Sequence, residues 1–348
     1  MQEATDRIQF LARLGAAMAS ASYPVTFVRQ TLERVSAGYG QHNEVVALPN
    51  NVQVVGPTFR EGTPVASASV GSALRFDQTF PLAQLVTRTI EGRVSPADGQ
   101  RDLNRIIARR RPYPAWVTVI GYGVFSAGLA LVMEPTVLNL MAATVLGLMV
   151  GVMWTVTERA PVLAPVTPVL AAVVVAGLCI VGAQYLSLDH VGLRALIPPL
   201  AVFLPGLAIT VSVIELAAGD VISGASRLVA GFMQLAQLTF GIFIASHMLG
   251  FDDAQLTSQA VNKLGPWAPW LGVGVFVVGI MLFLAPPLAF LPWLAVLAYT
   301  AYVAQYLGDL LLGGYTSGFF GALALTVAAL LIARRRDSPP AVAMVVPG

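Results

Sequence analysis

Eight long apolar runs between Tyr113 and Ala333 decide what this chain can fold into. Each run is close to the ~20 residues that a helix needs to cross the ~30 Å hydrocarbon core of a bilayer. We place the spans at residues 114–133, 136–156, 162–184, 195–217, 223–248, 267–284, 287–305 and 313–333. Hydrophobic residues make up 56% of the chain and charged residues 11%, outside the usual range of soluble proteins. We therefore predict an α-helical polytopic membrane protein.

Residues 1–111 predict a small cytoplasmic α+β domain before the first span. Apolar residues recur at helical spacing from Ile8 and again after Pro24, which indicates two amphipathic helices. β-rich runs separated by turn residues predict a strand–turn–strand meander over residues 44–76. Two further helices follow, and Ser95 is a candidate N-cap for the second of them.

The charges at the ends of the spans predict the orientation of the chain. Arginines mark one set of ends, at positions 109–111, 159, 227 and 334–336. Acidic residues dominate the other set, at positions 134, 189, 252, 253 and 309. The positive-inside rule places the arginine-rich ends, and with them the N-terminal domain, in the cytoplasm. Both ends of the chain then lie on one side, which eight crossings satisfy.

An internal repeat predicts the organisation of the membrane part. The stretch "PPLAVFLPG" at 198–206 resembles "PPAVAMVVPG" at 339–348, and each follows three spans. The charges indicate that the two copies enter the membrane from opposite sides, as in the inverted repeats of transporters. We expect a first five-helix repeat at 112–250 and an incomplete second repeat at 251–348. The second has three helices and the start of a fourth, so about two helices are lacking.

The first copy of this motif holds candidate substrate-binding residues. Pro205 and Gly206 can break the helix and expose backbone groups to a substrate, or they can form a simple kink against a neighbour. Thr210 and Ser212 can offer hydroxyls to a substrate, or they can bond back to the carbonyl one turn earlier.

Glu215 and Asp220 are the candidates for proton coupling. A carboxylate at membrane depth is costly, and no cation lies within a helical turn of Glu215. A partly desolvated carboxylate can exchange a proton, as a proton-coupled carrier requires. The alternative is that Glu215 reaches cytoplasmic water, because Asp220 is five positions away. Asp220 can instead belong to a loop, and Arg227 is interpreted as a positive-inside anchor.

Other polar residues in the spans have weaker interpretations. Gln234, with Gln237 on the same helix face, can hydrogen-bond an amino acid or another helix. His247 is interpreted as a solvated interfacial residue. Tyr302 and Asp309 belong to a group that can line a pathway, although an interfacial aromatic belt is favoured.

Several function classes lack their parts in this sequence. It contains no Walker motif, G-x-S-x-G or H-E-x-x-H, and no basic patch with interleaved aromatics for nucleic acid. Cys179 is the only cysteine, so an intrachain disulfide and a cysteine metal site are excluded. We expect neither an enzyme nor a cofactor, a metal site or a nucleic-acid partner.

The chain resembles the threonine/serine exporter family of bacterial membrane carriers. The resemblance rests on the order and spacing of segments that, taken singly, are weak: "LARLGAAMASASYPVTFVRQTLERVSAGYG", "VVALPNNVQV", "SPADGQRDLNRI", "FLPGLAITVSVIELAAGDVISGASRL", "FLAPPLAFLP" and "VVPG". The matching core positions are Pro205, Gly206, Glu215, Asp220, Ser223 and Gly224.

The resemblance implies a cytoplasmic N-terminal domain and ten membrane helices in two halves. It further implies export of L-threonine and L-serine coupled to protons, across the inner membrane of a bacterium. A homo-oligomer or a partner chain would complete the second repeat. A membrane-anchored sensor or scaffold that works through the N-terminal domain is the alternative.

Overall fold

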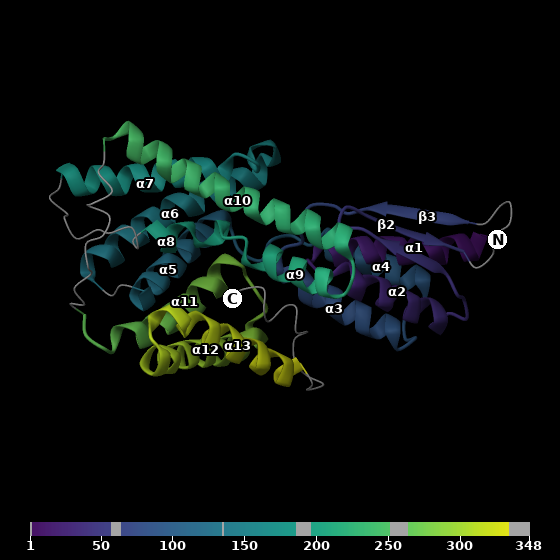
Figure 1. The fold of residues 1–348 in the computed structure, drawn as a ribbon. Coiled ribbons are helices and arrows are strands. Elements are labelled where there is room, and N and C mark those ends of the chain that lie inside the picture. The colour runs from purple at the N-terminus through teal and green to yellow at the C-terminus, as the bar shows by residue number, and fades with distance from the viewer. Residues whose placement is uncertain (1, 57–63, 134–135, 186–195, 251–263, 334–348) are drawn as a thin grey trace. The chain divides into compact units, whose positions relative to one another are not determined.

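The computed structural model describes residues 2–56, 64–133, 136–185, 196–250 and 264–333, and most of them are helical (Figure 1). The chain forms two compact units. The first contains residues 1–111 and 206–231, and the second contains residues 112–205 and 232–348. A segment from the middle of the chain therefore packs with the N-terminal domain. Each unit is described by itself below.

The first unit combines helices with a small antiparallel sheet. Its N-terminal helices are α1 (Gln2–Ser20), α2 (Val25–Gly38), α3 (Phe76–Ile90) and α4 (Pro96–Ile107). Its strands are β1 (Glu44–Ala47), β2 (Asn51–Val55) and β3 (Val65–Ser69), in the order β1-β2-β3 with antiparallel pairing. Register is set by pairs such as Val46 with Gln53 and Gln53 with Ser67. The predicted helices and meander are confirmed.

Helix α1 forms the centre of this unit because it packs on β2, β3, α2 and α4. Its apolar face, which includes Ile8, Leu11 and Leu14, is fully buried. Ser95 caps α4, since its hydroxyl accepts a hydrogen bond at 3.2 Å from the N–H of Asp98. Helix α2 begins after Pro24, but no side-chain cap comes from that residue.

A helical hairpin completes the first unit. Helix α9 (Gly206–Ala217) is followed by α10 (Val221–Met248), whose first turns up to Gly231 belong to this unit. Gly219 ends α9 with φ +86°, a left-handed conformation that favours glycine. The two helices approach closely at Gly224, where a Cβ would lie 2.9 Å from the backbone oxygen of Ser212.

The second unit is built from apolar helices. They are α5 (Ala115–Met133), α6 (Val137–Arg159), α7 (Thr167–Tyr185), α8 (Ile197–Leu200), the rest of α10, α11 (Ala268–Phe283), α12 (Leu291–Leu312) and α13 (Gly314–Ala333). Short 3-10 turns lie at Pro161–Leu163, Ala201–Phe203 and Leu288–Phe290. Each of the eight predicted apolar runs contains a helix in its described part, and the run at 195–217 is interrupted at Leu204 and Pro205.

Only some of the described apolar helices are long enough to cross a membrane by themselves. By length and composition, four described helices can cross a membrane: α5, α6, α10 and α12 with its preceding turn. A fifth candidate is the broken pair Ile197–Phe203 and Gly206–Ala217, and α7, α11 and α13 are shorter apolar helices. Eight crossings, the cytoplasmic N-terminus and the division into repeats at residue 250 stay predictions. The second copy of the repeat motif lies outside the described residues.

Glycines allow α5 and α11 to pack at backbone distance. Gly121 and Gly128 on α5 lie seven residues apart, as do Gly272 and Gly279 on α11. A Cβ at Gly128 would meet the backbone of Phe276, and one at any of the other three would also meet the facing helix. Small residues at such interfaces are a common means of helix association in membranes.

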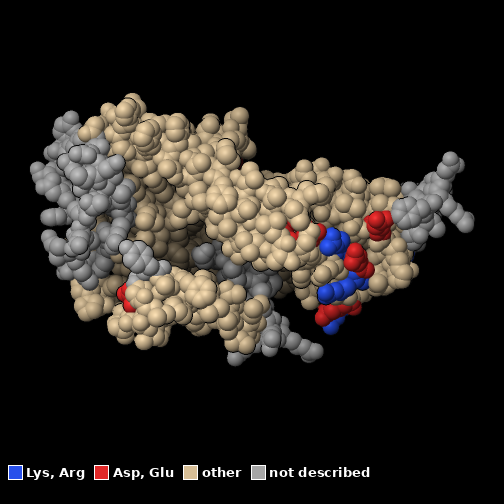
Figure 2. Space-filling model, in the orientation of Figure 1, with Lys and Arg blue, Asp and Glu red and all other residues tan. Residues whose placement is uncertain are grey.

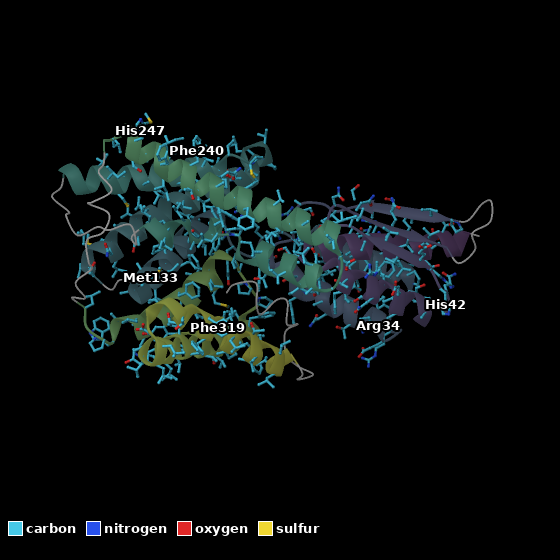
Figure 3. The ribbon with its side chains drawn as sticks, viewed as in Figure 1. Arg34, His42, Met133, Phe240, His247 and Phe319 are labelled. Atoms are coloured by element: carbon cyan, nitrogen blue, oxygen red, sulfur yellow. The ribbon has the colours of Figure 1, made fainter. Side chains whose placement is uncertain are left out.

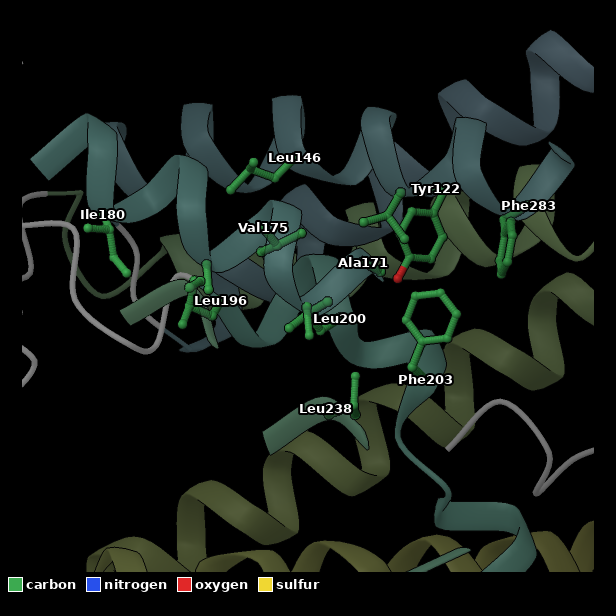
Figure 4. Close-up of a cluster of buried hydrophobic side chains, with 14 residues drawn as sticks. Tyr122, Leu146, Ala171, Val175, Ile180, Leu196, Leu200, Phe203, Leu238 and Phe283 are labelled. Carbon is green, nitrogen blue, oxygen red and sulfur yellow. The ribbon is translucent and has the colours of Figure 1, made fainter. Parts of the chain in front are cut away.

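A buried cluster holds the short helix α8 in the second unit (Figure 4). Tyr122 of α5 is fully buried there, and its ring packs edge-on against Phe283 with centroids 4.9 Å apart. The Tyr122 hydroxyl donates to the carbonyl of Pro199 at 2.8 Å and accepts from the N–H of Val202 at 3.3 Å. One side chain thus satisfies two backbone groups where the helix is interrupted.

Charge is distributed very unevenly over the chain. On the face shown in Figure 2, basic and acidic side chains gather on the first unit, whereas the described surface of the second is almost wholly uncharged. Exposed apolar side chains are frequent on the second unit, for example Val152, Phe243 and Leu311. This pattern is that of a helical bundle whose surroundings are lipid.

Candidate functional site

Glu215 of α9 is a fully buried carboxylate that lies at the start of helix α2. Its side chain is charged and lies on an apolar helix, and it is 0% exposed. Its Oε1 accepts a hydrogen bond at 3.0 Å from the backbone N–H of Val25, the first residue of α2. Helix N-termini carry unpaired N–H groups and a partial positive charge, so a carboxylate is stabilised there. Glu215 therefore supplies the cap that α2 lacks locally, and it does not reach water.

Arg227 pairs with the same carboxylate. Its Nε lies 3.2 Å from Glu215 Oε2, and the arginine side chain is 18% exposed. Gly224 makes this possible, because the missing Cβ allows the first turn of α10 to approach α9. The view of Glu215 as uncompensated is therefore wrong, and Arg227 is a partner in the site as well as a basic residue near a helix end.

A second ion pair lies beside the first. Arg29 of α2 donates to Asp220 Oδ1 at 3.2 Å, with side chains 38% and 18% exposed. Asp220 follows Gly219 in the turn between α9 and α10, and its N–H donates to the carbonyl of Glu215 at 2.9 Å. We refer to Val25, Arg29, Glu215, Asp220 and Arg227 as the ion-pair cluster. All five belong to the first unit.

The ion-pair cluster leaves hydrogen-bonding capacity unused. Four buried side-chain atoms in and beside it have no hydrogen-bond partner among the described residues: Thr26 Oγ1, Glu215 Oε2, Asp220 Oδ2 and Arg227 Nε. Glu215 Oε2 and Arg227 Nε are at ion-pair distance but do not meet hydrogen-bond geometry. Most buried polar atoms in proteins are hydrogen-bonded, so four exceptions in one neighbourhood require an explanation.

The turn before α2 is apolar and well packed. Tyr23 is 4% exposed and its ring stacks on Phe27 with centroids 5.5 Å apart. Burial raises the pKa of Tyr23 to about 12, because the charged phenolate is poorly solvated there. The start of α2 is thus fixed on one side by aromatic packing and on the other by Glu215.

The residues predicted to bind substrate near the helix break do not belong to the ion-pair cluster. Pro205 is buried and Gly206 begins α9, where a Cβ would meet open space. The hydroxyl of Thr210 donates to the carbonyl of Gly206 at 2.8 Å, and that of Ser212 donates to the carbonyl of Ile209 at 2.8 Å. Both hydroxyls therefore make the local backbone bonds that were the alternative interpretation.

Gln234, Gln237 and His247 lie farther along α10, in the second unit. Both glutamines are partly exposed. His247 is in the last turn of α10 (Figure 3). Its ring stacks on Phe243 with centroids 6.0 Å apart. The role of Gln234 in substrate binding stays a prediction from the sequence.

The second unit contains an apolar pocket of about 160 Å³ between α5, α11, α12 and α13. Tyr302 and Gln305 are its polar lining residues, and the rest are mostly aliphatic. The ring of Tyr302 packs against Trp270 at 5.0 Å, and Tyr306 lies 6.4 Å from the same indole. The expected aromatic group is present, and this pocket is too apolar to suit a zwitterion.

Sequence reasoning missed two members of the ion-pair cluster on α2. Val25 contributes a backbone N–H, which no sequence pattern marks, and Arg29 is one basic residue on an amphipathic helix. The signal that could have located them was Pro24, because a helix start without a Ser, Thr, Asp or Asn cap requires a partner from elsewhere.

Comparisons with known proteins place the chain among membrane proteins. Residues 9–249 match the model of a protein family described as "Putative threonine/serine exporter". Relatives named pheromone-regulated membrane protein 10 occur in Eremothecium gossypii, with 23% identity over 86% of this chain and 41% of the relative, and in Saccharomyces cerevisiae (strain S288c), with 25% identity over 63% and 58%. The chain thus spans about two-fifths of the Eremothecium protein. No solved structure matches.

Proposed function

Because the chain belongs to the threonine/serine exporter family, we propose that it is a secondary transporter that exports L-threonine and L-serine from the cytoplasm. The family is one of membrane exporters and not of enzymes. Inward movement of protons drives the export, as an antiport. The protein resides in the inner membrane of a bacterium, with residues 1–111 in the cytoplasm.

The ion-pair cluster is the observation that supports proton coupling most strongly. Glu215 is fully buried beside Arg227, on a helix that begins at the Pro205 break of an apolar span. Protonation of a carboxylate in a buried pair removes its charge and weakens the pair, so the two protonation states favour different arrangements. A carrier that exchanges protons for substrate needs such a group.

Exposed apolar side chains on the hairpin support a site at the edge of the membrane. Val213, Ile214, Val221 and Ile222 are between 48% and 77% exposed, while Glu215 faces the N-terminal helices. The hairpin thus presents one apolar face and one charged face. Asp220, in the same turn, is the second candidate for proton exchange.

Export from cells tests this proposal. Cells fed a threonine-containing dipeptide accumulate threonine, and its appearance outside is compared for the parental chain, the Glu215→Gln variant and an empty vector. The matched control is Glu33→Gln, an exposed carboxylate on α2. We expect parental export to exceed that of the vector, Glu33→Gln to equal the parent, and Glu215→Gln to lose the dependence on external pH. Parental pH dependence in Glu215→Gln would remove the coupling role.

If no hydroxy amino acid leaves the cell, the export data would favour the alternative function, a membrane-anchored sensor. Under that alternative the N-terminal domain binds a ligand by itself. Because residues 206–231 pack with residues 1–111, binding should be measured on the full chain. Threonine that binds without being exported would support the sensor.

A further inference from the structure

Four polar atoms in and beside the ion-pair cluster have no hydrogen-bond partner within the part of the chain that the structure describes, and together they have the pattern of a ligand site. They are Thr26 Oγ1, Glu215 Oε2, Asp220 Oδ2 and Arg227 Nε, all buried. Three contacts hold the Glu215, Asp220 and Arg227 atoms in one neighbourhood at the start of α2: Val25 N to Glu215 Oε1, Arg29 to Asp220, and Arg227 to Glu215. Thr26 follows Val25 directly and precedes Arg29 by one helical turn.

These atoms differ in charge and in hydrogen-bonding role. Glu215 and Asp220 offer anionic acceptors, Arg227 offers a cationic donor, and Thr26 offers a hydroxyl that donates and accepts. A hydroxy amino acid has the complementary set: an ammonium, a carboxylate and a hydroxyl. Inorganic phosphate would be repelled by the two carboxylates, and a metal ion by the two guanidinium groups.

We propose that the transported amino acid inserts into the Glu215–Arg227 pair. Its ammonium donates to Glu215 Oε2 and Asp220 Oδ2, its carboxylate accepts from Arg227 Nε, and its hydroxyl pairs with Thr26 Oγ1. The inference rests on the proposed function and specifies its substrate site. Because Thr26 lies on α2, the N-terminal domain contributes a residue to that site.

Insertion of a zwitterion leaves the net charge of the site unchanged. The substrate brings one positive and one negative group, so each member of the separated pair keeps a counter-charge. Glu215 must be ionised for this, because a protonated carboxyl would leave the ammonium with less charge to face. Arg227 of α10 faces Glu215, and Arg29 of α2 faces Asp220. Protons and substrate therefore compete, which is the requirement for an antiport.

Thr26 is assigned as the residue that recognises the substrate hydroxyl. Its Oγ1 is buried and lies on the second residue of α2. A site that hydrogen-bonds a hydroxyl discriminates against the analogue that lacks it, since its own polar group is then left unpaired. L-Threonine and L-2-aminobutyrate differ by this one group.

Binding to the purified full-length protein in detergent tests the inference. Affinities for L-threonine and L-2-aminobutyrate are measured calorimetrically for the parent, Thr26→Val and Thr26→Ser. We expect the parent to prefer threonine by about tenfold, Thr26→Val to lose that preference and Thr26→Ser to keep it. A merely structural role for Thr26 would change both affinities equally.

A second measurement uses Glu215→Gln and the pH dependence of threonine binding. In the parent, threonine affinity is expected to fall as the pH is lowered, because protons compete with the ammonium for the carboxylates of the site. In Glu215→Gln the affinity should be weaker and should depend less on pH, because only Asp220 remains to take up a proton. An unchanged threonine preference in Thr26→Val, or parental pH dependence in Glu215→Gln, overturns the inference.

Export distinguishes this failure from failure of the proposed function. If cells export threonine while Thr26→Val retains the parental ratio of threonine to 2-aminobutyrate, the substrate site is wrong and the exporter stands. If the parent neither exports nor binds a hydroxy amino acid, both the proposed function and the inference are overturned.

Discussion

The carboxylate of Glu215 accepts a hydrogen bond at 3.0 Å from the backbone N–H of Val25, 190 positions earlier in the chain. One contact therefore joins the start of an N-terminal helix to an apolar helix from the middle of the sequence. The stability of that junction depends on the charge of Glu215 and on the arginine that faces it.

Removal of Glu215 and removal of Arg227 should be coupled in their effect on stability. Glu215→Ala leaves Arg227 partly buried without its counter-charge and α2 without its cap, a loss of about 3 kcal/mol. Arg227→Ala should cost a similar amount. The double variant should lose less than the sum of the two. Apparent melting temperatures of the purified protein provide this double-mutant cycle, and strict additivity would mean that the pair is not coupled.

The pair of Arg29 and Asp220 should matter much less for stability. Its side chains are 38% and 18% exposed, so solvent screens the interaction and we expect Arg29→Ala to cost about 1 kcal/mol or less. The loss should shrink as salt is added. Melting of Arg29→Ala and Arg227→Ala at low and high salt compares the two directly. A larger loss for Arg29→Ala would reverse our ranking.

Tyr122→Phe should weaken the attachment of α8. The change keeps the ring but removes the hydroxyl that contacts Pro199 and Val202, so a buried carbonyl loses its donor, at about 1–3 kcal/mol. Tyr299→Phe is the matched control, since its hydroxyl contacts the carbonyl of Trp270 at an exposed position. Equal melting temperatures for the two variants would show that the Tyr122 hydroxyl contributes nothing special.

Gly128→Ala should destabilise the helical bundle, although alanine has the higher helix propensity. The added Cβ would meet the backbone of Phe276, which has no rotamer to change. We expect overpacking of about 1–3 kcal/mol to exceed the gain of up to about 1 kcal/mol in propensity. Gly177→Ala in α7 is the control, because its Cβ would lie 3.9 Å from Leu249. Melting in detergent should therefore move in opposite directions for the two variants.

Alkaline pH should destabilise the first unit through Tyr23. Burial raises the pKa of Tyr23 from 10.0 to about 12, so the folded state holds this proton more tightly than the unfolded state does. The resulting stabilisation, about 2–3 kcal/mol, is complete below pH 10 and is lost as the pH rises through 12. Tyr23→Phe should show a smaller loss of stability over that interval. Identical pH profiles for parent and variant would contradict this assignment.

Local patterns were sufficient for most of the secondary structure. Pro24 and Ser95 mark helix starts by chemistry that acts within one turn, and the apolar runs specify helices through their length. The meander at 44–69 follows from alternation and turn residues. In each case the determining groups are neighbours in the sequence.

The candidate site could be predicted only in part, because it depends on contacts between distant segments. Glu215 stood out as a carboxylate in an apolar run, but its pairing with Arg227 depends on a tight turn at Gly219 and the close approach at Gly224. Its contact with Val25 involves a backbone group that has no sequence signature. Thr26 carries no signal in the sequence either, since a threonine in the first turn of a helix is common.

The 190 positions between Val25 and Glu215 also impose an order on synthesis. At bacterial or eukaryotic elongation rates of about 5–20 residues per second, the start of α2 waits roughly 10–40 s for its cap to be made. During that interval the apolar helices α5 to α8 leave the ribosome. The first unit can therefore complete its fold only after residues 206–231 have been synthesised. By then the apolar helices that precede them in the chain have already been made.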